Sequence, residues 1–188
     1  MKTLQLKGDK RNNAGKKFTK IERAQGLVPC VIYGGTENQH FTLDKKSFKE
    51  LVYTPDVYLI DLEVEGKKYS SVLKDIQFHP ISDEIIHADF LEIFPHKLIK
   101  IGIPVRLIGN SIGVKSGGRL AQKLRKMNVS ALPGDLPDFI EINVSKLDIG
   151  GTFKVKDVVA EKVTLLDSPN AVIATVQITR AARSAQNG

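Results

Sequence analysis

Hydrophobic residues along this 188-residue chain recur mostly with the two-residue period that is typical of half-buried strands. The clearest case is a pair of alternating runs, 58–64 and 69–73, joined by Glu65-Gly66, which predicts a β-hairpin. Short runs of the same kind predict further strands at 4–6, 28–33, 41–43, 76–78, 85–94, 98–107, 139–144, 153–155, 163–166 and 171–178. We therefore predict a mainly β protein with short helices.

Helical spacing occurs in few segments. The apolar positions of 18–24 lie three residues apart and precede Gly26, which predicts a helix that ends there. Asp44 is a candidate N-cap for a second helix, over 44–52. Residues 120–131 fit a helix and a strand alternation equally, and the pattern leaves that segment open.

The alternating pattern restarts after Phe94-Pro95-His96, which predicts a domain boundary at that point. We expect an N-terminal domain over 1–94 and a C-terminal antiparallel β domain over 95–179. The small and polar residues 180–188 predict a disordered tail. Pro104 interrupts one of the runs of the second domain, which favours an edge position for that strand.

Charge is concentrated rather than spread. The net charge is +7 and the isoelectric point is near 9.4. Residues 1–33 hold eight Lys and Arg against two acids, residues 34–94 hold six against twelve, and residues 95–188 hold fourteen against seven. Two basic zones next to a neutral or acidic body favour a protein that meets nucleic acid along chosen surfaces.

Composition excludes several other classes. An apolar content of 41% is enough to build real cores, and the single Cys30 excludes an intrachain disulfide and predicts a packed thiol in a reducing compartment. The chain shows neither a signal-peptide pattern nor an apolar stretch of membrane-spanning length, so we expect a cytoplasmic protein without a membrane partner. No nucleotide-binding fingerprint occurs, which gives no support to a small-molecule substrate or cofactor.

One polar constellation stands out. His87 and Asp89 are two residues apart on a predicted strand and therefore point to the same side. They follow shortly after Asp75, Gln77 and His79. The pair fits a structural His–Asp contact or an RNA contact, whereas a metal or hydrolytic site would need further ligands or a nucleophile that the spacing does not supply. We predict no catalytic residue and no metal.

Tyr33 ends an apolar strand just after the basic segment. It fits a core position, or a ring that stacks on a base or reaches a ribose.

An ordered set of residues resembles a known family. The set comprises Arg11, Gly15-Lys16, Lys20, Arg23-Ala24, Pro29 to Gly35, Lys74 to Pro80 and His87 to Phe90, followed by Ile103-Pro104-Val105, Gly109, Gly113-Val114-Lys115, Gly117 to Leu120, Leu132-Pro133, Leu136-Pro137, Ile140-Glu141, Val144 to Leu147 and Ile149-Gly150. In this order the chain resembles the long, two-domain form of the bacterial 5S-rRNA-binding large-subunit ribosomal protein of the Ctc (general stress protein) family. The resemblance covers nearly the whole chain.

The resemblance implies an N-terminal β-barrel that grips 5S rRNA in the large ribosomal subunit. It also implies a C-terminal β domain that faces neighbouring rRNA or ribosomal proteins. The family's RNA-contact positions fall on Arg11, Lys16, Lys20, Arg23, Tyr33, Gln77, His87 and Asp89. This chain has fewer arginines than is usual there, so we expect some contacts to go to phosphate only, with Glu22 facing away from RNA.

Three alternatives stay open at this point. The first is a free RNA-binding stress protein that acts off the ribosome. The second is an enzyme that uses His79, His87 and Asp89. The third is a protein-interaction module in the second domain, whose bases would then only solvate a β surface. These bases are Lys97, Lys100, Arg106, Lys115, Arg119, Lys123, Arg125 and Lys126.

Overall fold

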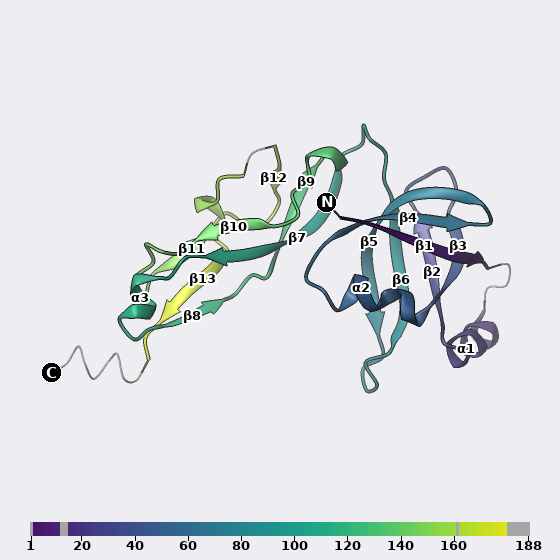
Figure 1. The fold of residues 1–188 in the computed structure, drawn as a ribbon, viewed down its shortest axis with the longest axis horizontal. Coiled ribbons are helices and arrows are strands. Elements are labelled where there is room, and N and C mark those ends of the chain that lie inside the picture. Colours follow the sequence, from purple (N-terminus) through teal and green to yellow (C-terminus); the bar gives the residue numbers. More distant parts are fainter. Residues whose placement is uncertain (1, 12–14, 161, 180–188) are drawn as a thin grey trace. The chain divides into compact units, whose positions relative to one another are not determined.

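The structure, a computed structural model, describes residues 2–11, 15–160 and 162–179, so the predicted tail 180–188 lies outside the described residues. Six strands close into a barrel in the order β1-β3-β2-β6-β5-β4 (Figure 1). They are β1 (Lys2–Lys10), β2 (Leu27–Tyr33), β3 (Gln39–Asp44), β4 (Tyr58–Val64), β5 (Lys67–Phe78) and β6 (Ile85–Glu92). The predicted hairpin is therefore confirmed as β4 and β5, and the predicted strand 76–78 is the end of a continuous β5 with a bulge after Leu73.

Inward-facing residues from all six strands fill the barrel. The rings of Phe41 and Phe90 are fully buried and lie 5.5 Å apart at 51°, a tilted aromatic contact. Cys30 is 1% exposed, its thiol donates to the carbonyl of Val28 at 3.3 Å, and burial raises its pKa. The cysteine is a packed and unreactive part of this core, as its position in an apolar run predicts.

Gly8 allows β1 to close the barrel. Residues 2–8 run parallel to β4, and Asp9 and Lys10 pair antiparallel with β3. A Cβ at Gly8 would lie 2.8 Å from Cδ2 of Phe41 and 3.1 Å from the carbonyl oxygen of Thr42. A side chain at this crossing would push β1 away from β3, so the absence of a Cβ is what permits the close approach.

Helices are short. They are α1 (Lys16–Ala24), α2 (Phe48–Val52) and α3 (Ile112–Lys115), with 3₁₀ turns at Lys45–Ser47, Pro133–Asp135 and Val155–Asp157. The carboxylate of Asp44 accepts from the backbone N–H of Lys46 at 2.8 Å, which confirms the predicted cap. The helix predicted over 18–24 is confirmed as α1, and its apolar residues are exposed, Phe18 by 49% and Ile21 by 54%. No helix among these elements is long and apolar enough to cross a membrane.

The remaining strands form two sheets, one ordered β10-β7-β9-β12 and the other β11-β13-β8. Their bounds are β7 (Ile99–Ile108), β8 (Arg119–Gln122), β9 (Lys126–Ala131), β10 (Ile140–Asn143), β11 (Thr152–Lys154), β12 (Thr164–Leu165) and β13 (Val172–Gln177). The segment 120–131 thus resolves into strands, because Met127 and Val129 bury their side chains fully on one face of β9. The mainly β fold class is confirmed.

Two features of these sheets differ from the prediction. The pairs β11–β13, β13–β8 and β12–β9 are antiparallel as predicted, but β10 runs parallel to β7, because periodicity carries no information on strand direction. β7 is also central and not an edge strand, despite Pro104. The N–H of Val105 bonds to Arg125 on one side, and the ladder with β10 starts only at Val105 on the other. The missing N–H of Pro104 therefore interrupts no ladder bond.

The chain divides into two compact units. One contains the residues up to 99 together with 132–134, and the other contains 100–131 and the residues from 135 onward. We keep 1–94 and 95–179 as proposed domain bounds, since β6 ends at Glu92 and β7 begins at Ile99.

Candidate nucleic-acid interface

Side chains of β6 alternate between the barrel interior and its outer surface. Ala88 and Phe90 are fully buried and point inward, so His87 and Asp89 point outward. β2 runs parallel to β6 on one side, and β5 runs antiparallel to it on the other. The outer face of β2, β6 and β5 is therefore one continuous surface with His87 and Asp89 along its middle strand.

The neighbouring strands add the other predicted residues to this outer face. Gln77 on β5 lies directly opposite His87. Tyr33 on β2 lies opposite Leu91, which has the same outward parity as Asp89. Burial raises the pKa of the Tyr33 phenol, and the charges of Asp89 and Asp75 raise it further. The Tyr33 ring therefore lies close to these two carboxylates on the outer face. The structure thus brings together the four strand-borne residues that the sequence singled out.

His87 and Asp89 are in direct contact. Nδ1 of His87 lies 2.8 Å from Oδ1 of Asp89, but the ring nitrogen is not aligned for a hydrogen bond. The two side chains are therefore in close contact without a directed N–H···O bond. Both side chains remain about 30% exposed, so each can still be reached from solvent. An imidazole donor and a carboxylate acceptor are thus held side by side on the surface.

Asp75 also belongs to this face, although the sequence reasoning left it out of the contact set. It lies directly opposite Asp89 across the β5–β6 ladder, just after the bulge in β5. One oxygen of Asp75 accepts from the backbone N–H of Ile76 at 2.9 Å. Two carboxylates in cross-strand register repel each other, which favours a ligand that brings hydrogen-bond donors. The sequence holds one indication of this placement: Asp75 is two residues from Gln77, and residues two apart on a strand point to the same side.

The two arginines of the basic segment are already bonded to the protein. Nε of Arg11 donates to Glu22 at 3.0 Å, and its Nη2 donates to the hydroxyl of Thr19. Nε and Nη2 of Arg23 donate to the backbone carbonyl of Ile86 at 3.0 and 2.7 Å. Arg11 ties the end of β1 to α1, and Arg23 ties α1 to β6. The carboxylate of Glu22 is thus held by Arg11, and its orientation away from RNA stays a prediction.

The two lysines of the predicted set are different. Lys16 and Lys20 are exposed and, together with Gly15, Thr19 and Arg23, line an open depression beside α1. Among the described residues, neither lysine forms an ion pair. α1 therefore presents the free ammonium groups of Lys16 and Lys20 while Arg11 and Arg23 hold the helix in place, and a phosphate is the natural partner for such groups.

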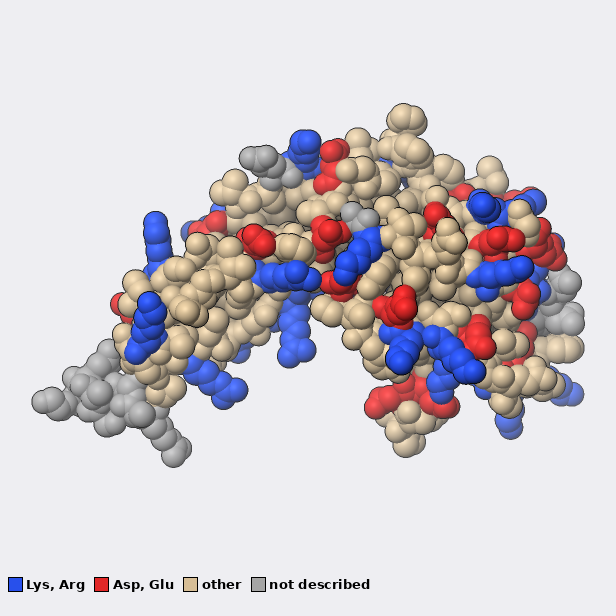
Figure 2. Space-filling view, in the orientation of Figure 1, with Lys and Arg blue, Asp and Glu red and all other residues tan. Residues whose placement is uncertain are grey.

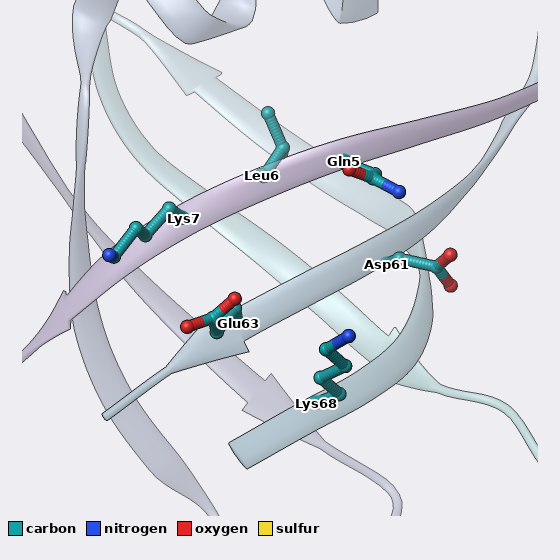
Figure 3. Close-up of a pocket in the computed structure, with 6 residues that line it drawn as sticks. All are labelled: Gln5, Leu6, Lys7, Asp61, Glu63 and Lys68. Atoms are coloured by element: carbon teal, nitrogen blue, oxygen red, sulfur yellow. The ribbon is translucent and has the colours of Figure 1, made fainter. Parts of the chain in front are cut away.

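The outer face of β1, β4 and β5 is a contrast within the same barrel. A second open depression there is lined by Gln5, Leu6, Lys7, Asp61, Glu63 and Lys68 (Figure 3). Glu63 lies opposite Lys7 on one neighbouring strand and Lys68 on the other. Acids and bases are interleaved over much of the barrel surface (Figure 2). Charges of both signs at close range give this face little attraction for a polyanion.

The groups needed for metal chemistry are not gathered in the described residues. No set of three His, Cys, Asp or Glu side chains that could hold a metal ion occurs within 2–11, 15–160 and 162–179. His79, the third histidine of the enzyme alternative, uses Nδ1 to accept from the backbone N–H groups of Ile81 and Ser82 at 3.4 and 3.3 Å. It shapes the β5–β6 turn.

Comparison with known proteins identifies relatives along the whole chain. Residues 6–90 match the ribosomal L25p family, and residues 98–180 match the C-terminal domain of ribosomal protein TL5. The large ribosomal subunit protein bL25 of Azobacteroides pseudotrichonymphae genomovar. CFP2 is 46% identical over 98% of both chains. Proteins of the same name from Amoebophilus asiaticus and Bacteroides thetaiotaomicron are 44% and 43% identical, over 98% of this chain and 94% and 97% of theirs.

Proposed function

The chain belongs to the ribosomal L25p family, and we propose that it is a structural, non-enzymatic protein of the large ribosomal subunit that binds 5S rRNA through its barrel. The observation that carries the proposal is the single outer face on which Tyr33, Gln77, His87 and Asp89 meet. The protein would then be found with cytoplasmic ribosomes. The relatives' name, large ribosomal subunit protein, supports the same assignment.

Recognition divides between two kinds of group. Lys16 and Lys20 neutralise phosphates and set the register of the RNA on the barrel. The outer face of β2, β6 and β5 reads the wide, shallow minor groove of an RNA helix, where base edges and 2′-hydroxyls are accessible. The carboxylates of Asp75 and Asp89 accept from base amino groups or 2′-hydroxyls, and such donors relieve the repulsion between the two acids.

Arg11 and Arg23 first hold α1 in place on the barrel, and each can in addition contact RNA. Arg11 and Arg23 each use Nε and Nη2 within the protein, which leaves Nη1 of each guanidinium for a phosphate. Because both side chains are anchored, such a contact would be made at a fixed place relative to β6. A guanidinium held in this way loses little side-chain freedom on binding.

Titration of the full chain with 5S rRNA and with an unrelated RNA helix, at several KCl concentrations, tests the proposal. We expect tighter binding to 5S rRNA and a steep loss of affinity with salt. The double variant Lys16→Ala/Lys20→Ala should weaken both RNAs alike and reduce the salt slope by about 2. Equal affinity of the unchanged protein for both RNAs would remove the basis for specific recognition.

Sedimentation distinguishes the ribosomal role from that of a free RNA-binding stress protein. In a sucrose gradient of cell extract at low salt, the chain should travel with large subunits, and a high-salt wash should release part of it, because the phosphate contacts weaken with salt. Recovery of the protein mainly at the top of the low-salt gradient would favour the free form, even if binding to 5S rRNA in the titration were specific.

A further inference from the structure

The sheet β11-β13-β8 gives the second unit an outer surface. On β8, Leu120 lies opposite the fully buried Val176 of β13, so this side of the sheet faces the core of the unit. Arg119 and Ala121 alternate to the other side, where they lie opposite Gln177 and Thr175. The outer surface is therefore built from small or polar side chains with an arginine at one end.

The strands of this sheet carry bases but no acids, although Asp148 beside α3 and Asp157 after β11 lie in adjoining segments. Exposed bases adjoin the sheet at the end of α3, on β8 and in the turn and strand that follow: Lys115, Arg119, Lys123, Arg125 and Lys126. In the part of the chain that the structure describes, none of these five forms an ion pair. The positive charge is available to an external anion.

The size and polarity of the side chains on this surface indicate which class of partner it can bind. A stable protein interface needs large apolar or aromatic anchors at its centre. This face offers Ala121 and Thr175 there, and the hydroxyl of Thr175 already donates to the carbonyl of Gly151 at 3.1 Å. Small residues allow a polyanion backbone to approach the sheet closely, and exposed bases neutralise it. The surface thus suits a phosphate backbone better than an acidic protein.

We propose that the outer face of β11-β13-β8, with Arg119 on β8 and Lys123 at its end, binds the phosphate backbone of a second RNA segment, distinct from the RNA held by the barrel. Lys115, Arg125 and Lys126 lie in the segments before and after β8 and add positive charge near this face. Arg119 is the central contact, because its planar guanidinium pairs with two phosphate oxygens at once. Gln177 lies beside it in register and supplies an amide donor for a 2′-hydroxyl. Lys123 extends the track from the end of β8.

The test uses the full chain with its barrel saturated by 5S rRNA. A fluorescently labelled RNA duplex of about 20 base pairs and unrelated sequence, long enough to span several phosphates of both strands, is titrated into this complex at several KCl concentrations. We expect a ternary complex with salt-sensitive affinity. Arg119→Ala/Lys123→Ala should weaken duplex binding roughly tenfold or more near 0.1 M salt and lower the salt slope by about 2. Its affinity for 5S rRNA should stay within about twofold of the unchanged protein, because no barrel phosphate contact is lost.

A matched control removes two charges from the other unit. Lys67→Ala/Lys68→Ala takes two exposed lysines from the β4–β5 hairpin and should leave duplex binding to the saturated complex unchanged. Thermal unfolding of both variants checks that they fold. Duplex binding that is absent, or that is equal in Arg119→Ala/Lys123→Ala and the unchanged protein, overturns the proposal.

Competition with polyglutamate separates RNA from acidic protein. If polyglutamate displaces the duplex at equal charge concentration, the face is a general acid-binding surface and the RNA assignment is overturned. The proposal is independent of the barrel's function. If specific 5S rRNA binding fails while the β8 face still binds duplex, only the barrel assignment is lost. If duplex binding fails while 5S rRNA is bound specifically, only the proposal for the β8 face is lost.

Discussion

The barrel and the second unit use their basic residues in different ways. In the barrel unit, several bases are ion-paired within the protein, namely Lys2 with Asp56, Lys10 with Glu65, Arg11 with Glu22 and Lys45 with Glu84, whereas Lys16 and Lys20 of α1 have no ion-pair partner among the described residues. On and around β8, the five exposed bases of the second unit, Lys115, Arg119, Lys123, Arg125 and Lys126, have no ion-pair partner among the described residues. Paired and anchored groups have a fixed place and suit discrimination between RNAs, whereas unpaired bases supply attraction that does not depend on sequence.

The largest effects are expected from substitutions that destabilise the hydrophobic core of one unit at a time. Phe90→Ala deletes a fully buried ring from β6 and should cost the barrel about 3–5 kcal/mol of unfolding free energy. Because His87 and Asp89 lie on the same strand, binding of 5S rRNA should fall with it. Amide hydrogen exchange should show lost protection in β5 and β6 but unchanged protection in β8 and β13.

The reciprocal variant is Ile173→Ala in β13, where the side chain is also fully buried. It should cost about 2–5 kcal/mol in the second unit and spare barrel exchange rates and 5S rRNA binding. Loss of protection in both units in either variant would mean that the two cores unfold together, and the separation of roles argued above would lose its support.

A smaller effect separates anchored from free bases within the barrel segment. Arg11→Ala removes the guanidinium that pairs with Oε1 of Glu22. Because Oε2 of Glu22 is buried and has no hydrogen-bond partner, the variant leaves both carboxylate oxygens without one. We expect a loss of about 1–3 kcal/mol in urea unfolding. Lys20→Ala, its exposed control on the same helix, should change the unfolding free energy by less than about 0.5 kcal/mol. Equal losses would show that the anchoring of Arg11 is immaterial.

Asp89→Asn probes the electrostatics of the outer face. The charge of Asp89 is one cause, after burial, of the raised pKa of Tyr33, so the substitution should lower that pKa. A raised folded-state pKa stabilises the fold below the unfolded value near 10, and this contribution is lost as pH rises through the folded-state pKa. NMR titration of the Tyr33 ring, with Tyr33→Phe for assignment, measures the shift.

The same Asp89→Asn variant should reduce the preference for 5S rRNA over an unrelated helix by about 1–2 kcal/mol, because a charged acceptor is lost. Affinity for the unrelated helix should not fall. An equal loss of affinity for both RNAs would show that Asp89 does not discriminate between RNAs and only supports the structure of the barrel.

The smallest expected effect concerns a fully exposed pair. Lys45 lowers the pKa of Glu84, through a hydrogen bond and then through its charge. A lowered folded-state pKa stabilises the fold above about pH 4.5, and this stabilisation is lost as pH falls through the lowered value. Lys45→Ala should return the carboxyl of Glu84 toward its ordinary pKa in an NMR titration, with Lys46→Ala as the neighbouring control. An unmoved titration would show that the two side chains do not interact in solution.

Local patterns in the sequence predicted those features that depend on near neighbours. The alternation of 58–64 and 69–73 predicted the hairpin, and the cap at Asp44 and the outward pairing of His87 with Asp89 follow from i, i+2 geometry. The segment 120–131 stayed open because a short apolar run fits both periods. The exposure of Phe18 and Ile21 was missed, because spacing indicates a helix and not whether anything covers it.

The sequence by itself thus determined the mainly β class, the basic zones, the family and the residues able to meet RNA. The tertiary structure decided which of those residues stand together. The register of β2, β6 and β5 brings Tyr33 and Gln77 to the His87–Asp89 pair, and contacts with Glu22 and Ile86 turn two arginines into anchors. The physical reason is that strand order, strand direction and hydrogen-bond partners are long-range properties. They depend on how distant segments pack, which no local pattern encodes.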